Sequence, residues 1–129
     1  VEKEGLAKLN CTYTVSGAVE DGVIIEALTA QTASGNSASV DNSASSASGG
    51  SGYIQVTAKS GTSPTMAVKI QHSADDSSFA DLITFTTASD LTAERKTVSG
   101  TVNRYLRVNR TIGGSSTPSV TYMVAFSRG

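Results

Sequence analysis

The clearest indication of the fold class of this 129-residue chain is the segment Val120-Thr121-Tyr122-Met123-Val124-Ala125-Phe126-Ser127. Its even-numbered positions are all β-branched or aromatic, and they alternate with Thr121, Met123, Ala125 and Ser127. A period of two residues is that of a β-strand with one face in a core, whereas a helix repeats every 3.6 residues. The segment therefore predicts a half-buried strand.

The same reasoning predicts about seven further strands upstream. They lie at residues 9–15, 23–28, 53–58, 66–71, 79–85, 95–98 and 105–112. Turns rich in Gly, Ser and Pro separate them, and no segment shows convincing helical periodicity. This spacing indicates an all-β fold, an antiparallel two-sheet sandwich of the jelly-roll or immunoglobulin-like type. The absence of Trp and of a second Cys argues against a true immunoglobulin domain.

The chain has the length of one domain with a single hydrophobic core. Residues 1–28 are predicted to form an N-terminal β-hairpin or assembly arm, and residues 53–129 the sandwich body. Residues 29–52 connect the two and are rich in Ala, Ser, Asn and Gly, which allows two interpretations. They form a flexible linker, or else an edge strand near residues 37–40 followed by a long loop.

The composition argues against several function classes. Only 16% of the residues are charged and the net charge is −1, so no strong field attracts nucleic acid or an anionic membrane. Small hydroxyl residues, 20 Ser and 16 Thr, take the place of charges on the surface. The lone Cys11 excludes an internal disulfide and a thiolate zinc site, and the lone His72 leaves little for catalysis. We therefore expect no enzyme, no metal and no cofactor.

Two groups of polar residues near the middle of the chain have simpler explanations than metal binding or catalysis. Asp75, Asp76 and Asp81 offer oxygen ligands for calcium, but their spacing fits no EF-hand and acidic residues commonly form turns. His72, Ser73 and Asp75 contain the residue types of a catalytic triad. Adjacency in sequence is not triad geometry, because the base must reach the nucleophile and the acid from separate directions.

Arginines and tyrosines provide the remaining candidate contacts. Arg104 and Arg110 share one face of a predicted strand and Arg107 lies on the other, which suits carboxylate contacts at an interface. With the apolar residues of the N-terminal hairpin, the predicted interface set is Tyr13, Val15, Val23, Ile25, Arg104, Arg107 and Arg110. An alternative set for stacking against a glycan is Tyr53, Tyr105 and Tyr122, although strand tyrosines more often pack at a sandwich edge.

Residues 52–85 and 98–108, continued by Ile112-Gly113-Gly114 and residues 124–128, resemble a domain recurrent in virion proteins of tailed bacteriophages. The resemblance implies a non-enzymatic β-sandwich on the virion surface, appended to a tail tube protein or decorating the capsid. Its implied partners are copies of itself in a symmetric assembly and other phage capsid or tail proteins. Residues 9–17 and 23–28 resemble the closing hairpin of a tail-tube-like domain, which implies an arm used in assembly.

A looser resemblance concerns Ser73-Ala74-Asp75-Asp76-Ser77-Ser78-Phe79. This run is similar to a motif of discoidin-type carbohydrate-binding jelly rolls, with Asp76 and Ser77 in the region where Gly is expected and Phe79 in place of Trp. It implies an alternative function, a carbohydrate-binding module that aids adsorption to host glycans.

Overall fold

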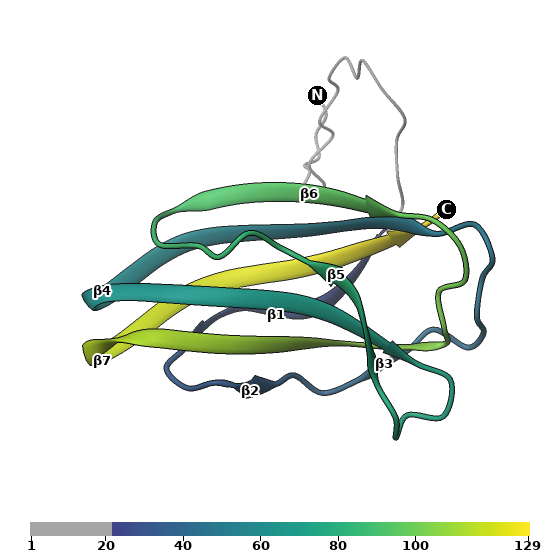
Figure 1. Ribbon diagram of the computed structural model, residues 1–129, viewed down its shortest axis with the longest axis horizontal. Coiled ribbons are helices and arrows are strands. Elements are labelled where there is room, and N and C mark those ends of the chain that lie inside the picture. The colour runs from purple at the N-terminus through teal and green to yellow at the C-terminus, as the bar shows by residue number, and fades with distance from the viewer. Residues whose placement is uncertain (1–21) are drawn as a thin grey trace, which may run out of the picture.

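The computed structural model describes residues 22–129, and this part of the chain is all-β (Figure 1). Its strands are β1 (Val23–Gln31), β2 (Gly35–Asn36), β3 (Val40–Asp41), β4 (Gly50–Ser73), β5 (Ala80–Thr84), β6 (Thr92–Val98) and β7 (Tyr105–Arg128). The described residues contain no helix that could cross a membrane. The predicted strand at residues 9–15, with Cys11, Tyr13 and Val15, lies outside the described residues.

The fold is built on an antiparallel ribbon of the two longest strands. β4 and β7 have 24 residues each, and they pair from Gly50 opposite Arg128 to Ser73 opposite Tyr105. Both strands bend near the middle, where the register shifts, and both bends lie at the left in Figure 1. Gly61 (φ +98°) and Gly114 (φ +115°) give the bends a backbone conformation that other residues rarely adopt. The sequence predicts Gly- and Ser-containing turns at residues 60–64 and 113–116, between these predicted strands. In the structure they are bends that fold one ribbon in two.

Folding the ribbon produces two layers. In the first layer, residues 50–60 of β4 and 119–128 of β7 lie between β6 and β1. In the second layer, residues 65–73 of β4 and 105–113 of β7 lie between β5 on one side and β2 and β3 on the other. All strand pairings are antiparallel, and the folded ribbon places the strands in two layers. The predicted antiparallel two-sheet sandwich is therefore confirmed.

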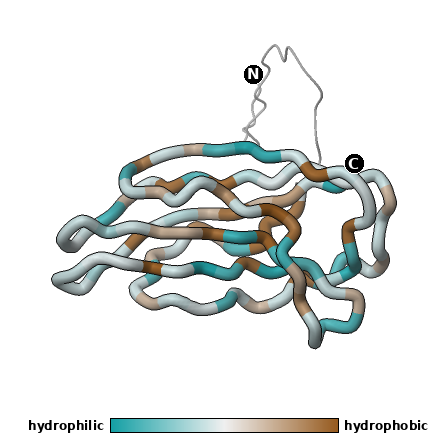
Figure 2. Tube along the Cα trace, in the orientation of Figure 1, coloured by the Kyte–Doolittle hydropathy of each residue, from teal (hydrophilic) through white to brown (hydrophobic). Residues whose placement is uncertain are grey.

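The core lies between the layers and follows the predicted alternation. Val120, Tyr122, Val124 and Phe126 are at most 3% exposed. They pack with buried apolar residues from both layers: Ile25, Ile54, Val56, Met66, Val68, Ile70, Ile83, Phe85, Ala88, Val102, Leu106 and Val108. Figure 2 shows apolar segments on the strands of both layers, whereas the bends of the ribbon are nearly white. Burial of this shared cluster holds the layers together.

The middle of the predicted connecting segment, residues 35–46, runs along an edge of the sandwich. β2 and β3 pair with β7 at the edge of the second layer, and Ser46 forms a bridge with Val102. The Ser37 backbone N–H donates to the Val108 carbonyl at 2.8 Å, and its hydroxyl accepts from the Val108 N–H at 2.9 Å. Of the two interpretations, the edge describes the structure better than the flexible linker does, but the single strand expected near residues 37–40 is replaced by two short strands, β2 and β3. β1, β2 and β3 all pair with β7, which is part of the predicted sandwich body, residues 53–129. Hydrogen bonds therefore join β1 and this segment to the body.

Glycines in the low-complexity run are needed where elements come very close. A Cβ at Gly52 would lie 2.7 Å from Ile70 Cδ1 and 2.8 Å from Ile83 Cδ1, both in the opposite layer. At Gly49, with φ +66°, a Cβ would collide with the Val98 carbonyl. The run is therefore constrained by packing, although its composition is that of a flexible linker.

The close approach at Gly49 predicts a difference between two glycine substitutions. Gly100 also has positive φ (+90°), but nothing lies within 4 Å of the position that a Cβ would occupy there. We expect Gly100→Ala to lower the free energy of unfolding by about 1–2 kcal/mol through backbone strain alone. Gly49→Ala should cost at least twice as much, because the Val98 backbone must also move. Urea unfolding of both variants measures this, and equal losses would contradict the packing argument.

Candidate functional site

The outer face of the first layer carries an apolar surface that we call the outer platform. Ile24 of β1, Ala125 of β7, Tyr53 of β4 and Arg95 of β6 form one row across the four strands, because each is register partner of the next. Gln55 pairs with both Met123 and Ala93 and forms the adjacent row. The outer platform thus consists of Ile24, Tyr53, Gln55, Ala93, Arg95, Met123 and Ala125.

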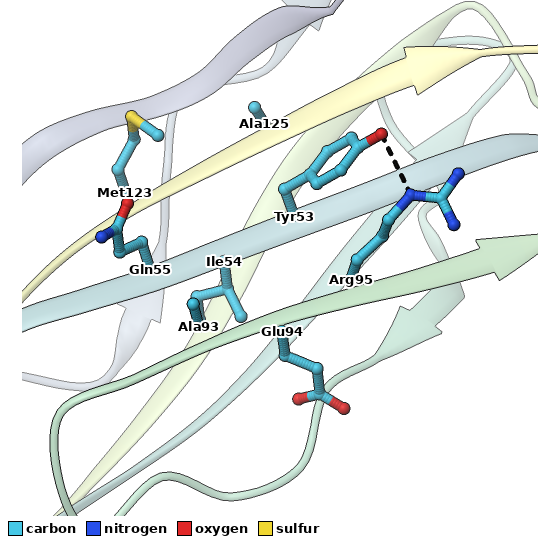
Figure 3. Close-up of a pocket in the computed structure, with 8 residues that line it drawn as sticks. All are labelled: Tyr53, Ile54, Gln55, Ala93, Glu94, Arg95, Met123 and Ala125. Carbon is cyan, nitrogen blue, oxygen red and sulfur yellow. Dashed lines mark hydrogen bonds between the residues drawn. The ribbon is translucent and has the colours of Figure 1, made fainter. Parts of the chain in front are cut away.

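A shallow depression of about 490 Å³ occupies the middle of the outer platform (Figure 3). Tyr53 and Arg95 point toward each other across it: Arg95 Nε donates to the Tyr53 hydroxyl at 3.2 Å, and its guanidinium lies 5.6 Å from the ring centroid. A second nitrogen of Arg95 donates to Ser51 Oγ at 2.8 Å. These contacts order an aromatic ring and a guanidinium beside aliphatic side chains.

The neighbours of the depression leave its middle largely apolar. Glu94 points away from Tyr53 and Arg95 in Figure 3, and its carboxylate accepts from the Thr86 N–H at 2.9 Å and the Thr86 hydroxyl at 3.0 Å. Ile24 is 49% exposed, and Leu28 beyond it on β1 is 57% exposed. Tyr, Met and Arg are the residues enriched in the centres of protein interfaces. The outer platform therefore has the composition of a contact surface.

The predicted arginines do not form one surface. Arg104 binds Asp41 with two hydrogen bonds of 2.6 and 2.8 Å, and its guanidinium lies 5.0 Å from the Tyr105 ring centroid. The hydrogen bonds from Arg104, and then from the Ser43 backbone, lower the pKa of Asp41 to about 2. Arg107 lies 3.9 Å from the ring centroid of Phe79 and donates to Gln71 at 2.9 Å.

Arg110 belongs instead to a polar cluster at the edge of the core. Its guanidinium lies 3.2 Å from the Glu26 carboxylate, and the two side chains are only 12% and 10% exposed. The Tyr122 hydroxyl donates to the same carboxylate. Burial, and then the hydrogen bond to Glu26, raise the pKa of Tyr122. Because Glu26 is in the first layer and Arg110 in the second, their contact joins the two layers.

A register shift explains why Glu26 turns inward. β1 pairs Ile24 with Ala125 but Glu26 with Val124, so Ile25 is an extra residue in the ladder. Both Ile25 and Glu26 are then largely removed from solvent, which simple alternation does not allow.

Burial corrects two of the predicted contact residues. Ile25 is 6% exposed within the core, so it is not available to a partner subunit, and its assignment to the interface is wrong. Tyr122 is fully buried and cannot stack on a sugar. Val23 is half-buried at the start of β1. Of the predicted tyrosines, Tyr53 lies on the outer platform, and Tyr105 has the Arg104 guanidinium over its ring.

The triad-like residues have local structural roles. His72 Nδ1 accepts from the Asn103 N–H at 3.1 Å, and burial, then the charge of Arg128, lower the pKa of His72. The Ser73 hydroxyl donates to Asp75 at 2.8 Å, and that carboxylate also accepts the N–H groups of the turn at residues 77 and 78. Hydrogen bonds to Ser78, then to Ser73, lower the pKa of Asp75.

The acidic residues of this region do not gather around a common point. Asp81 accepts from Lys69 at 2.7 Å and from Gln71 at 2.8 Å. Within residues 22–129, no three His, Cys, Asp or Glu side chains come together as a metal site requires.

Sequence reasoning identified only Tyr53 of the outer platform. The available signal was in the opening segment itself, where Met123 and Ala125 make the solvent face of a strand unusually apolar. Recognising the site also required the register that places Ile24 and Arg95 in one row with Tyr53 and Ala125.

Comparisons with known proteins give a distant structural likeness. No family model and no curated protein matches the chain. Among solved structures, it is similar to a family 29 carbohydrate-binding module from Piromyces equi, with 16% identity and a TM-score of 0.42. The match covers 87% of this chain and 93% of that one. At this level of similarity the likeness says nothing about what this chain binds.

The polar cluster between the layers predicts that replacing Arg110 lowers the free energy of unfolding much more than replacing Arg104 does. Replacing Arg110 by Met leaves the Glu26 carboxylate without its cation at a site that is 10% exposed, which should cost about 3–5 kcal/mol of unfolding free energy. Arg104→Met breaks the exposed pair with Asp41 and should cost far less, because water replaces the lost contact. Chemical denaturation compares the two, and similar losses would show that the cluster does not join the layers.

Proposed function

We propose that this chain is a non-enzymatic structural module of a tailed-bacteriophage virion, displayed on the outside of the particle and bound to neighbouring subunits through the outer platform. The resemblance of residues 52–85, 98–108, 112–114 and 124–128 to a domain of virion proteins supports the biological setting. The observation that carries the proposal is the outer platform itself, a largely apolar depression on the outer face of the first layer in which Tyr53, Met123 and Ala125 are half-buried.

The physical properties of the outer platform suit a repeated contact. Tyr53 and Arg95 already hold each other in place, so a partner loses little side-chain entropy when it orders them. The surface of the chain is rich in Ser and Thr and carries few charges, so copies can pack closely without strong repulsion. A modest contact becomes durable in an array, because each subunit binds several neighbours at high effective concentration.

A charge placed on the outer platform tests this role. Ala125 is half-buried, and Ala125→Lys should prevent close contact with a partner because the ammonium would lose its hydration. Ala67→Lys is a matched control, since Ala67 is also half-buried and alternates with buried residues in the second layer. In phage particles assembled with each variant and purified on a density gradient, we expect at least a tenfold loss of Ala125→Lys and normal incorporation of Ala67→Lys.

Two results would contradict the proposal. One is recovery of the unmodified chain in the unassembled fraction, with none in the particles. The other is equal incorporation of the two lysine variants, each shown by circular dichroism to be folded.

A second candidate is carbohydrate binding at the same surface, which the half-buried Tyr53 ring favours. Gln55 and Arg95 lie beside this ring and offer hydrogen-bond donors to sugar hydroxyls, while the ring offers a stacking surface. Titration with host cell-wall oligosaccharides decides between the candidates: saturable binding that Tyr53→Ala lowers tenfold and Ala67→Lys leaves intact would favour the carbohydrate-binding module.

A further inference from the structure

β1 forms one edge of the first layer and has a partner on one side only. It pairs with β7, and within residues 22–129 no strand pairs with its other side. Residues 27–30 are all exposed, and Leu28 among them is 57% exposed. An open strand edge carries unpaired N–H and C=O groups that can bind another extended chain.

The other strand edges of the described chain are protected and β1 is not. β6 carries Glu94, Arg95 and Lys96 in succession, β5 has five residues and includes Asp81, and β2 and β3 have two residues each. β1 has nine residues, and its single charge, Glu26, is turned inward to Arg110. Since charges and shortness are the usual means of blocking edge pairing, β1 is the edge most open to a strand.

The chain itself contains a segment suited to this edge. Residues 9–15 alternate apolar and polar side chains, the pattern of a strand, and six residues separate this segment from Gly22. Gly22 immediately precedes β1, and a Cβ there would be 3.4 Å from the Phe126 carbonyl oxygen. Six extended residues span at most about 20 Å. This length allows residues 9–15 to reach a molecule that lies beside β1.

We propose that the free edge of β1 accepts residues 9–15 of a neighbouring copy of this chain. The inference rests on the proposed function, because it adds a second contact, beside the outer platform, between the same neighbouring subunits. Each copy then donates a strand and accepts one, a head-to-tail contact that generates a ring or a continuous array. The two register shifts of β1 shorten the ladder that a donated strand can form, so stability depends on many copies together.

The location of the edge also reduces the range of residues that can form the predicted assembly arm, which was residues 1–28. Ile25 is in the core and β1 pairs with β7, so β1 is part of the acceptor sheet. Only the residues that precede Gly22 are left to act as the donor.

Cross-linking the full chain tests the exchange, with Cys11 as a natural probe because it is the only cysteine. We would introduce a second thiol on the edge by Ala27→Cys or, separately, by Thr29→Cys, with Leu91→Cys as a control of similar exposure to Leu28 but outside β1. Each variant is prepared in ¹⁴N and ¹⁵N forms, mixed, concentrated and mildly oxidised. Mass spectrometry then identifies peptides that join Cys11 to the new thiol.

The exchange predicts that about half of the cross-links at position 27 or 29 join a ¹⁴N copy to a ¹⁵N copy, and that position 91 gives at least tenfold fewer. Cross-links confined to one isotope would show that each chain covers its own edge, and an absence of cross-links at both edge positions would show that residues 9–15 do not bind there. Either result overturns the inference. Loss of Ala125→Lys from particles would still support the proposed function, so the two failures are distinguishable.

Discussion

The continuous hydrogen-bonded ladder between β4 and β7 determines how the other strands of the sandwich are arranged. The two strands stay paired from Gly50 and Arg128 to Ser73 and Tyr105, through bends in both. β4 and β7 are therefore neighbours in both layers. Every other strand is added at the side of this ribbon, and the shared core forms because the folded ribbon brings its own two halves face to face.

Much of this architecture follows from alternation in the sequence. The four halves of β4 and β7 were predicted at nearly their observed positions, because Ile54, Val68, Val108 and Val124 lie on clear period-two faces. The pairing of those segments could not be predicted, since many strand orders satisfy the same pattern. The glycines at and just before the start of β4 show a second limit: the composition there is that of a linker, whereas close contacts with Ile70, Ile83 and Val98 explain Gly49 and Gly52.

The candidate site was harder to predict than the fold for a related reason. Its members come from four strands and meet only because of register, so no continuous motif marks them. Alternation also fails at the register shift of β1, where Ile25 and Glu26 both leave the solvent. The same shift makes β1 an edge without an outward charge, because Glu26 is used by Arg110 and Tyr122. The outer platform and this edge are contiguous through Ile24, which places both proposed contacts on one side of the molecule.

Amide hydrogen exchange in the native state tests most directly whether the folded ribbon makes the two layers one unit. If it does, amides on the ribbon at Ile54 and Val124 in the first layer and at Ile70 and Val108 in the second exchange only through global unfolding. Their opening free energies then agree with one another and with the value from chemical denaturation. Distinct opening free energies for the two layers would mean that each folds by itself, and would contradict the account.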